Sequence, residues 1–288
     1  MSTKLVDSIA ELYKKVSSEL PEDVVKALKK AKEKEKTPVA LNILNGILEN
    51  IELAKKNSLP VCQDTGIPVF YVSYNEGSQK EFKKAIIEAT KIATEKNYLR
   101  PNAVDPLTGR NNGNNIGENF PVIHFHEWDN DFLEINLMLK GGGSENIGMV
   151  YSLPDSSLNA YRDVDGIKKC VIDAMFKAQG NGCSPNIIGV GIGGSKSGAM
   201  ALAKKQLLRK LDDVNPDKIL ADIEKELYEK INKLGIGPMG LGGDVTVLGV
   251  KIGAQHRHPA CFFVAVSFMC WACRRGKIII KDSRIEVK

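Results

Sequence analysis

Residues 186–195 read NIIGVGIGGS, a short apolar run that ends in two adjacent glycines and a serine. Branched apolar side chains bounded by turn residues are typical of a buried strand. The glycines predict a tight turn, and the small-residue segment 196–207 that follows predicts a helix. A strand, a turn and a helix in direct succession indicate an α/β arrangement for this part of the chain.

Apolar periodicity extends this pattern on both sides. It predicts helices within 3–57 and at 79–96, 164–179, 196–207 and 216–233, and strands at 67–73, 121–126, 132–139, 186–192, 244–253 and 260–268. The sequence is therefore expected to form a mixed α/β fold. A helical N-terminal third (about 1–100) precedes an α/β region with a mixed sheet (about 101–288). A long polar loop with the run NNGNN (111–115) lies near this boundary, and such loops are usually functional or disordered.

The composition is that of an ordinary globular protein, with 43% hydrophobic and 26% charged residues among 288. No apolar run reaches the roughly 18 residues that a membrane span needs, and the N-terminus lacks a signal-peptide core. We therefore expect a cytoplasmic protein with no membrane partner. The net charge of +5 comes with no basic run interleaved with aromatics, so no nucleic-acid partner is expected, whereas a mild positive field favours a small anionic substrate.

Six cysteines in a reducing compartment indicate thiols, metal ligands or redox chemistry rather than disulfides. Cys62 and Cys183 lie in loops rich in glycine, proline and polar residues, and Cys270 follows an apolar strand. Three thiolates brought together by a fold can hold an iron–sulfur cluster and leave one iron without a protein ligand. Cys170 and Cys261 have apolar surroundings and are expected in the core.

Cys270 and Cys273 also form a CxxC pair, for which three interpretations stay open. A redox pair would need the first cysteine at a helix N-terminus. A zinc site would need further ligands, and the nearby His256 and His258 do not have the usual finger spacing. In the third interpretation one cysteine binds a cluster and the other is a neighbour.

Residues Gly189–Gly194 match GxGxxG, the dinucleotide-binding fingerprint, with Asp212 and Asp213 at a suitable distance for the acidic residue. The motif alone is weak. The acidic residues follow a helix rather than a strand, and the sequence shows no surrounding βαβ unit. A dinucleotide-binding oxidoreductase is therefore an alternative of a different class.

Three polar residues outside the cysteines have an ordinary structural interpretation, and two of them, Asp64 and Arg100, also have a functional one. Asp64 could close an Asx-turn, or it could transfer a proton beside a metal centre. Arg100 could be a surface residue, or it could clamp a carboxylate bidentately. His258 could belong to an ordinary turn at a strand edge.

Several of these segments together resemble the class I fumarase family, the iron–sulfur hydro-lyases that include tartrate dehydratase. The match is to the alpha subunit of the two-subunit form, and it covers nearly all of residues 1–288 as one domain. The motifs that carry the resemblance are PVCQDTG (60–66), LRPN (99–102), KGGGS (140–144), GCSPN (182–186), GPMGLGG (237–243), HRHP (256–259) and Cys270.

The resemblance implies a site and a reaction. It assigns Cys62, Cys183 and Cys270 to a [4Fe–4S] cluster with one iron open, and leaves Cys261 and Cys273 as bystanders. It implies that fumarate and L-malate interconvert by addition or elimination of water, as in the tricarboxylic acid cycle; L(+)-tartrate is the alternative substrate. The residues that it implies in substrate binding are Gln63, Asp64, Arg100, Gly142 and, more weakly, His258, with Asp64 also transferring a proton.

Single-chain members of this family continue into a second domain that supplies further substrate-binding groups. This sequence ends at Lys288. We therefore expect a separate beta subunit that completes the active site, in an assembly of two alpha and two beta chains, and a small dicarboxylate substrate. Metal analysis separates this hypothesis from a dinucleotide-binding oxidoreductase and from a zinc-stabilised scaffold protein built on residues 256–273.

Overall fold

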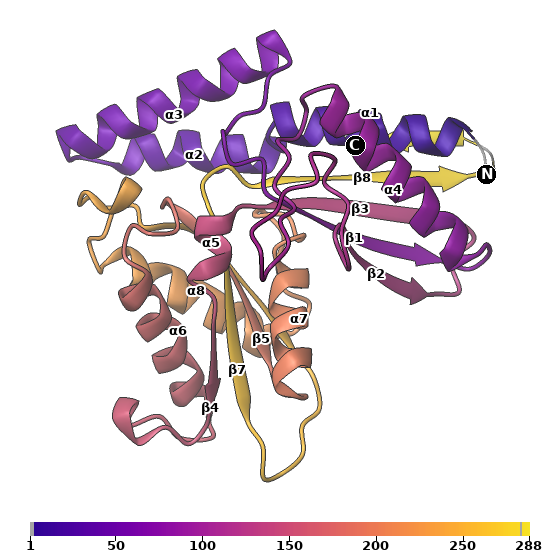
Figure 1. Ribbon diagram of the computed structural model, residues 1–288. Helices are drawn as coiled ribbons and strands as arrows, with labels where there is room; N and C mark the ends of the chain where they lie inside the picture. The colour runs from indigo at the N-terminus through magenta and orange to yellow at the C-terminus, as the bar shows by residue number, and fades with distance from the viewer. Residues whose placement is uncertain (1–2, 283) are drawn as a thin grey trace. The chain divides into compact units, whose positions relative to one another are not determined.

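Three helices come first in the computed structural model, which describes residues 3–282 and 284–288 (Figure 1). They are α1 (Thr3–Ser18), α2 (Glu22–Lys34) and α3 (Pro38–Asn57). The helical N-terminal part and the mixed sheets that follow confirm the predicted mixed α/β class.

The chain divides into two compact units, each built from separated segments. The first contains the chain up to Pro21, then Glu49–Gly142 and Arg274–Lys288, and the second contains Glu22–Leu48 and Gly143–Cys273. The chain thus passes from one unit to the other before α2, within α3, within the GGG motif and directly after the CxxC motif. The boundary expected near residue 100, between the helical part and the α/β part, falls inside the first unit.

The first unit has a five-stranded mixed sheet in the order β2-β1-β3-β8-β9. Its members are β1 (Ile67–Tyr74), β2 (Val122–Glu127), β3 (Leu133–Lys140), β8 (Arg274–Lys281) and β9 (Arg284–Val287). β1 runs parallel to β2, and the other pairs are antiparallel. Helices α1 and α4 (Gln79–Glu95) pack together and form one core with the apolar residues of β1 and β3. Tyr13 of α1 sits in this core, with its hydroxyl 2.8 Å from that of Thr90 in α4.

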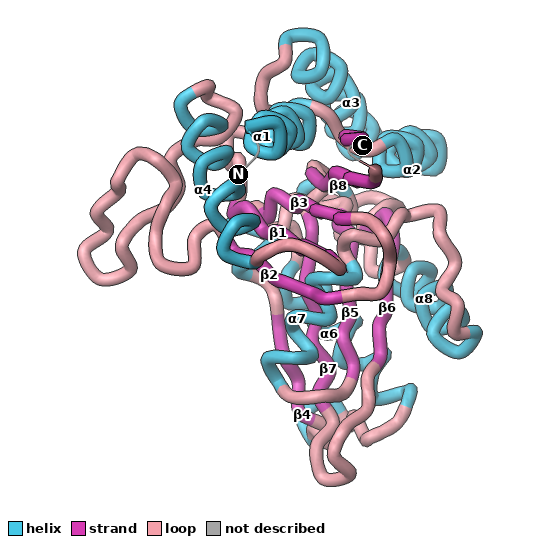
Figure 2. Tube along the Cα trace, turned by 90° about the vertical axis from the view of Figure 1, so that its right-hand side faces the viewer, coloured by secondary structure: helices cyan, strands magenta, loops and turns pink. Residues whose placement is uncertain are grey.

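The second unit has a four-stranded mixed sheet in the order β4-β7-β5-β6. From Gly143 onwards, the elements of this unit are α5 (Gly142–Asn146), β4 (Met149–Ser152), α6 (Val164–Ala178), β5 (Asn186–Ile192), α7 (Lys196–Gln206), α8 (Lys218–Asn232), β6 (Val247–Ala254) and β7 (Phe263–Met269). The first residue of α5, Gly142, still belongs to the first unit. Figure 2 shows the strands with the helices beside them. Val264 and Val266 of β7 pack with α6 and α8, whereas Ala265 packs with α7. Alternate side chains of a strand point to opposite faces, so α7 covers the other face of this sheet.

The glycines of the GxGxxG motif allow α7 to approach β5 closely. A Cβ atom at Gly191 would lie 2.0 Å from the backbone oxygen of Ala199, and one at Gly189 would lie 2.2 Å from that of Ala203. Backbone packing therefore explains two of the glycines without a nucleotide. β5 and β6 are parallel, with α7 and α8 between them in the chain, so the expectation that no crossover unit surrounds the motif is wrong.

Among the α-helices and strands, α5, β4, β8 and β9 were not anticipated from periodicity. β8 begins with Arg274 and Arg275, which are 1% and 8% exposed, so its buried positions do not show the apolar pattern of a strand. Its pairing with β3, which joins residues more than a hundred positions apart, decides its conformation. Within the described residues, no helix has the length and apolar character needed to cross a membrane.

Candidate active site

The loop that carries Cys62 is anchored at the residue before the cysteine. The N–H of Val61 donates to the carbonyl of Ser17 at 2.8 Å, and the carbonyl of Val61 accepts from the side-chain amide of Asn50 at 2.8 Å. Val61 is buried, whereas Cys62 is half-buried and Gln63 is exposed. The loop therefore holds its backbone on the unit and presents Cys62 and Gln63 outward.

Asp64 is held by hydrogen bonds to both of its carboxylate oxygens. Oδ1 accepts from the N–H of Gly66 at 2.9 Å, which is the Asx-turn that the sequence suggests. Oδ2 accepts from the N–H of Gly142 at 2.7 Å, across 78 residues of sequence. The carboxylate is exposed and each oxygen keeps a second lone pair. The carboxylate of Asp64 can therefore close the turn and still accept a proton.

Arg274 is a buried cation that the sequence reasoning missed. Its Nη1 donates to the carbonyl of Asp64 at 2.5 Å, while its Nε is buried without a hydrogen-bond partner among the described residues. The buried guanidinium therefore holds the backbone of the Cys62–Gly66 loop at Asp64. The available signal was the pair of arginines directly after the CxxC segment.

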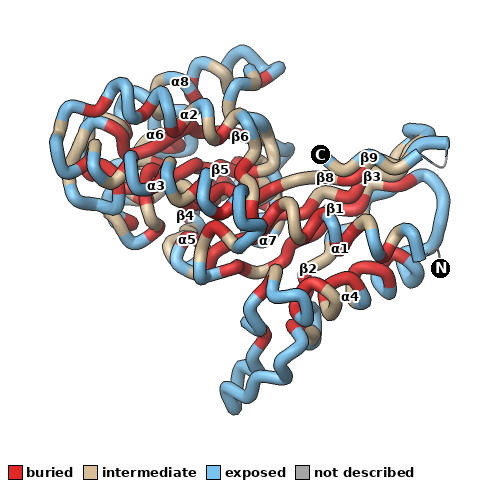
Figure 3. Tube along the Cα trace, turned by 90° about the horizontal axis from the view of Figure 1, so that it is seen from above, coloured by how far each residue is buried: buried red, intermediate tan, exposed pale blue. Residues whose placement is uncertain are grey.

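The polar loop after α4 is mostly exposed, but its base is tied to the Cys62–Gly66 loop (Figure 3). Thr65, 1% exposed, accepts from the N–H of Arg100 at 3.0 Å and from the side chain of Asn102 at 3.1 Å. Asn115 reaches back to the carbonyl of Arg100 at 2.7 Å. The backbone of Arg100 is thereby fixed near Asp64, and its side chain is exposed.

Cys183 lies in a tight loop just before β5. It adopts a φ of 54°, in the left-handed region that non-glycine residues rarely occupy, and its N–H donates to the carbonyl of Gly180 at 3.0 Å. The next residue, Ser184, is fully buried and bonds to the carbonyl of Gly237 at 2.6 Å. The glycine-rich segment 237–243 therefore acts as scaffold for the Cys183 loop.

Cys270 lies at the same end of the second unit's sheet as Cys183. β5 and β7 are antiparallel, with Ile187 opposite Met269, so the start of one strand adjoins the end of the other. The N–H of Trp271 donates to the carbonyl of Cys183 at 3.2 Å. The structure thus brings two of the three predicted ligand segments into direct contact. Cys62 belongs to the other unit.

The remaining cysteines differ from these three in their surroundings. Cys170 is fully buried in α6 as expected, and burial raises the pKa of its thiol to about 12. Cys273 is also fully buried. Cys261, however, is only half-buried in the loop before β7, so its expected place in a core strand is wrong because that strand begins at Phe263.

All six cysteines are thiols, with no disulfide between them. Within residues 3–282 and 284–288, no three His, Cys, Asp or Glu side chains converge on a position for one metal ion. The thiolates of an iron–sulfur cluster bind different irons, so they need not converge on one point.

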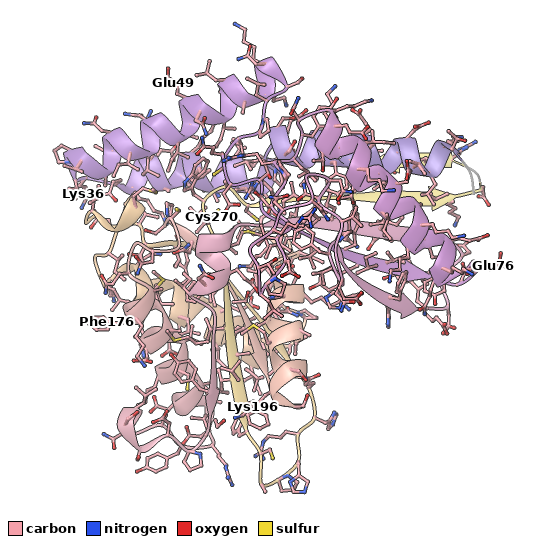
Figure 4. The ribbon with its side chains drawn as sticks, in the orientation of Figure 1. Lys36, Glu49, Glu76, Phe176, Lys196 and Cys270 are labelled. Atoms are coloured by element: carbon pink, nitrogen blue, oxygen red, sulfur yellow. The ribbon has the colours of Figure 1, made fainter. Side chains whose placement is uncertain are left out.

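His258 lies at the opposite end of β7 from Cys270, in the exposed loop between β6 and β7. Seven strand residues separate the two ends, which corresponds to roughly 20 Å. Lys196 is the first residue of α7 and lies at the same end of the sheet as this loop. Figure 4 shows it at the opposite end of the sheet from Cys270. Within one chain, His258 therefore shares a site with neither Cys270 nor Cys183, and a zinc site that combines it with the CxxC pair does not form.

Of the two acidic residues considered for dinucleotide binding, Asp212 and Asp213, the second is engaged elsewhere. Asp213 bonds to Arg209 at 2.8 Å and to Lys251 at 2.6 Å. Burial opposes its charge, but these two cations outweigh that effect and hold the pKa of Asp213 below its usual range. Its carboxylate serves an ion-pair network, not a ribose hydroxyl.

Comparison with known proteins identifies the family. The family model described as fumarate hydratase (Fumerase) matches residues 6–279. The chain belongs to the class I fumarate hydratase family. It is 48% identical over 290 residues to a protein of Geobacillus stearothermophilus provisionally named fumarate hydratase class I, covering 99% of this chain but 56% of that protein.

Two further relatives match along almost their whole length. A Methanocaldococcus jannaschii protein provisionally named L(+)-tartrate dehydratase subunit alpha is 40% identical over 292 residues, with 99% of both chains covered. The L(+)-tartrate dehydratase subunit alpha of Escherichia coli K12 is 35% identical, with 96% of this chain and 91% of that protein covered. This fumarate hydratase family member thus spans about half of the Geobacillus relative and nearly all of the two named as alpha subunits.

Proposed function

We propose that this chain is the cluster-binding subunit of a hydro-lyase that interconverts fumarate and L-malate. The observation that carries the proposal is the family match over residues 6–279, within which Cys183 and Cys270 lie on loops in direct contact. The residues also support the proposal, because the loops present three thiols that are not in a disulfide, those of Cys62, Cys183 and Cys270.

The donor chemistry of these residues fits an iron–sulfur cluster. Thiolates are the usual ligands of such clusters, and each of the three stands in a loop that is held by hydrogen bonds to its own unit. Cys62, Cys183 and Cys270 would hold the cluster. When bound, it would supply a Lewis-acidic iron with no protein ligand, suited to polarise the substrate's hydroxyl.

The chain's own residues would bind the substrate and move its proton. In the direction of fumarate, a base takes a proton from the carbon next to the C–OH group, the hydroxide leaves and water is released. Asp64 is the candidate base, because its exposed carboxylate is oriented by the N–H groups of Gly66 and Gly142. Arg100 and Gln63, both exposed, would bind a substrate carboxylate.

The proposed role of Gly142 is more limited than direct substrate binding. Its N–H already donates to Asp64, so it would act by orienting that carboxylate. We also propose a separate beta chain as partner, because the relatives of this length are named as alpha subunits and the Geobacillus relative is nearly twice as long. A pair of each chain is the assembly we propose, with His258 available to act outside the site of its own chain.

A second candidate substrate is L(+)-tartrate, since the two relatives that share this chain's length carry that name. It is also a hydroxy dicarboxylate, so the same residues would serve. Hydration of fumarate and dehydration of L-malate and L(+)-tartrate, measured with the purified two-chain complex, decides between the substrates.

The cluster itself is tested on the alpha chain. After anaerobic reconstitution with iron and sulfide, the wild type should show cluster absorbance and bound iron with sulfide. Cys62→Ser, Cys183→Ser and Cys270→Ser should each lose it, whereas Cys170→Ser and Cys261→Ser should keep it. Bound zinc without sulfide, or absorbance that survives all three ligand substitutions, contradicts the proposal.

A further inference from the structure

Asn186 is a fully buried polar residue at the first position of β5, and it joins the two cysteine segments of the second unit. Its Nδ2 donates to the carbonyl of Gly182 at 2.8 Å and to the carbonyl of Met269 at 3.2 Å. Gly182 and Met269 are the residues directly before Cys183 and Cys270. One side-chain amide therefore holds the backbone that leads into both cysteines.

The partners of Asn186 fix which way its amide points. Both nearby acceptors are carbonyl oxygens, so the NH₂ group must face them, since a flipped amide would set oxygen against oxygen. Its Oδ1 is buried and has no hydrogen-bond partner in the part of the chain that the structure describes. Burying such an oxygen is unfavourable. What this side chain contributes is therefore its two donated hydrogen bonds.

The surroundings leave the cysteine segments little freedom once the amide is in place. A Cβ atom at Gly182 would lie 2.4 Å from Cδ1 of Ile147 and 3.0 Å from Nδ2 of Asn186. The N–H of Trp271 adds a direct bond to the carbonyl of Cys183. Asn186 thus lies at the centre of a close-packed junction between the two segments.

We propose that Asn186 is a positioning residue that sets the placement of Cys183 relative to Cys270. Without its amide, the two segments would lose the two hydrogen bonds that Asn186 donates to them and would open more often. The consequence for a cluster rests on the proposed function, whereas the effect on the two thiols does not.

The first test uses the chain without metal. Asn186→Ala and Asn186→Asp both remove the NH₂ donor, and aspartate keeps the size of the side chain. Alkylation by iodoacetamide, followed peptide by peptide with mass spectrometry, should be roughly tenfold faster at Cys183 and at Cys270, because two hydrogen bonds no longer oppose opening. Cys170, buried in the same unit, should react as in the wild type because it reports general unfolding.

A matched control comes from Asn215, which is also buried in the second unit. Its Nδ2 donates to the carbonyl of Ile252 at 2.9 Å and to Glu224, away from both cysteine segments. Asn215→Ala should lower the melting temperature without increasing the rate at which iodoacetamide alkylates Cys183 or Cys270. The second test follows the loaded chain in air, where the Asn186 variants should lose cluster absorbance several-fold faster than wild type and Asn215→Ala should not.

The outcomes separate this inference from the proposed function. If the wild type takes up no iron and sulfide, the proposed function fails, and the alkylation rates still decide the role of Asn186. Unchanged rates at Cys183 and Cys270 in both variants overturn the positioning role. An equal acceleration at Cys170, or failure of both variants to fold, also overturns it, because Asn186 would then support the whole unit.

Discussion

Arg274 donates a hydrogen bond from Nη1 to the backbone carbonyl of Asp64, at 2.5 Å and across 210 residues of sequence. Arg274 starts β8, next to the CxxC segment, whereas Asp64 lies in the loop that presents Cys62. The start of β8 therefore holds the loop that carries the first predicted cluster ligand and the candidate base.

Arg274→Ala removes this support and leaves a buried void beside the Asp64 carbonyl. We expect the free energy of unfolding to fall by about 2–4 kcal/mol. Urea denaturation measures it, with Arg284→Ala as control, since Arg284 is exposed on β9 and its loss should cost less than about 0.5 kcal/mol. Equal midpoints for the two variants would show that the Arg274 bond contributes nothing.

Asp64→Asn tests the carboxylate as base. The amide keeps the size of the side chain but is no longer a proton acceptor, so kcat/KM of the two-chain complex should fall by about 10²–10⁴-fold, with iron and sulfide content unchanged. Asp105→Asn is the matched control: Asp105 also closes a turn in the first unit by accepting the N–H groups of Leu107 and Thr108. If Asp64→Asn keeps full activity, Asp64 is an anchor of the loop only.

Gly191→Ala tests whether the GxGxxG segment serves packing. The added Cβ would meet the Ala199 backbone oxygen at 2.0 Å, which only a shift of α7 can relieve, so we expect a loss of at least about 2 kcal/mol. Gly46→Ala, in the interior of α3 with no atom within 4 Å of the new methyl group, should instead stabilise by about 0.5–1 kcal/mol. Chemical denaturation of both variants checks the pair, and a Gly191→Ala protein of wild-type stability would contradict the packing explanation.

Glu35→Gln should remove a contribution to stability that depends on pH in a defined way. Burial alone would raise the pKa of Glu35, but the N–H groups of Thr37, Lys36, Asp244 and Val245 outweigh it and lower that pKa. A depressed carboxyl pKa stabilises the fold above the unfolded value of about 4.3, and this contribution disappears as the pH falls through the folded value. Glutamine cannot accept all four bonds, so the variant should be about 1–3 kcal/mol less stable at pH 7.

The difference between wild type and Glu35→Gln should then narrow below about pH 4. Urea denaturation across that range measures it. Glu49→Gln, at an exposed position of α3, should match the wild type throughout. A Glu35→Gln difference that stays constant with pH would assign the effect to side-chain shape instead of charge.

Local sequence was sufficient to predict the conformation of segments whose own pattern of apolar residues determines it. Apolar periodicity gave the helices from Thr3 to Asn57 and the strand at 186–192, because each depends on the spacing of its own side chains. The family motifs likewise pointed to Cys62, Cys183 and Cys270 from neighbouring residues alone, and the family itself is confirmed. Cys261 was misplaced because an apolar neighbourhood does not fix where a strand begins.

Only the tertiary structure decided the features that join distant residues. Three hydrogen bonds join positions 78 to 210 residues apart. Arg274 donates to the carbonyl of Asp64, and Gly142 donates to the Asp64 carboxylate. Asn186, at the start of β5, donates to the carbonyl of Met269, at the end of β7. Strand pairing creates them, and it also made a strand of residues 274–281 despite their buried arginines. The sequence thus determined the family and the residues that we propose for the chemistry, whereas the pairing of strands determined which residues hold them in place.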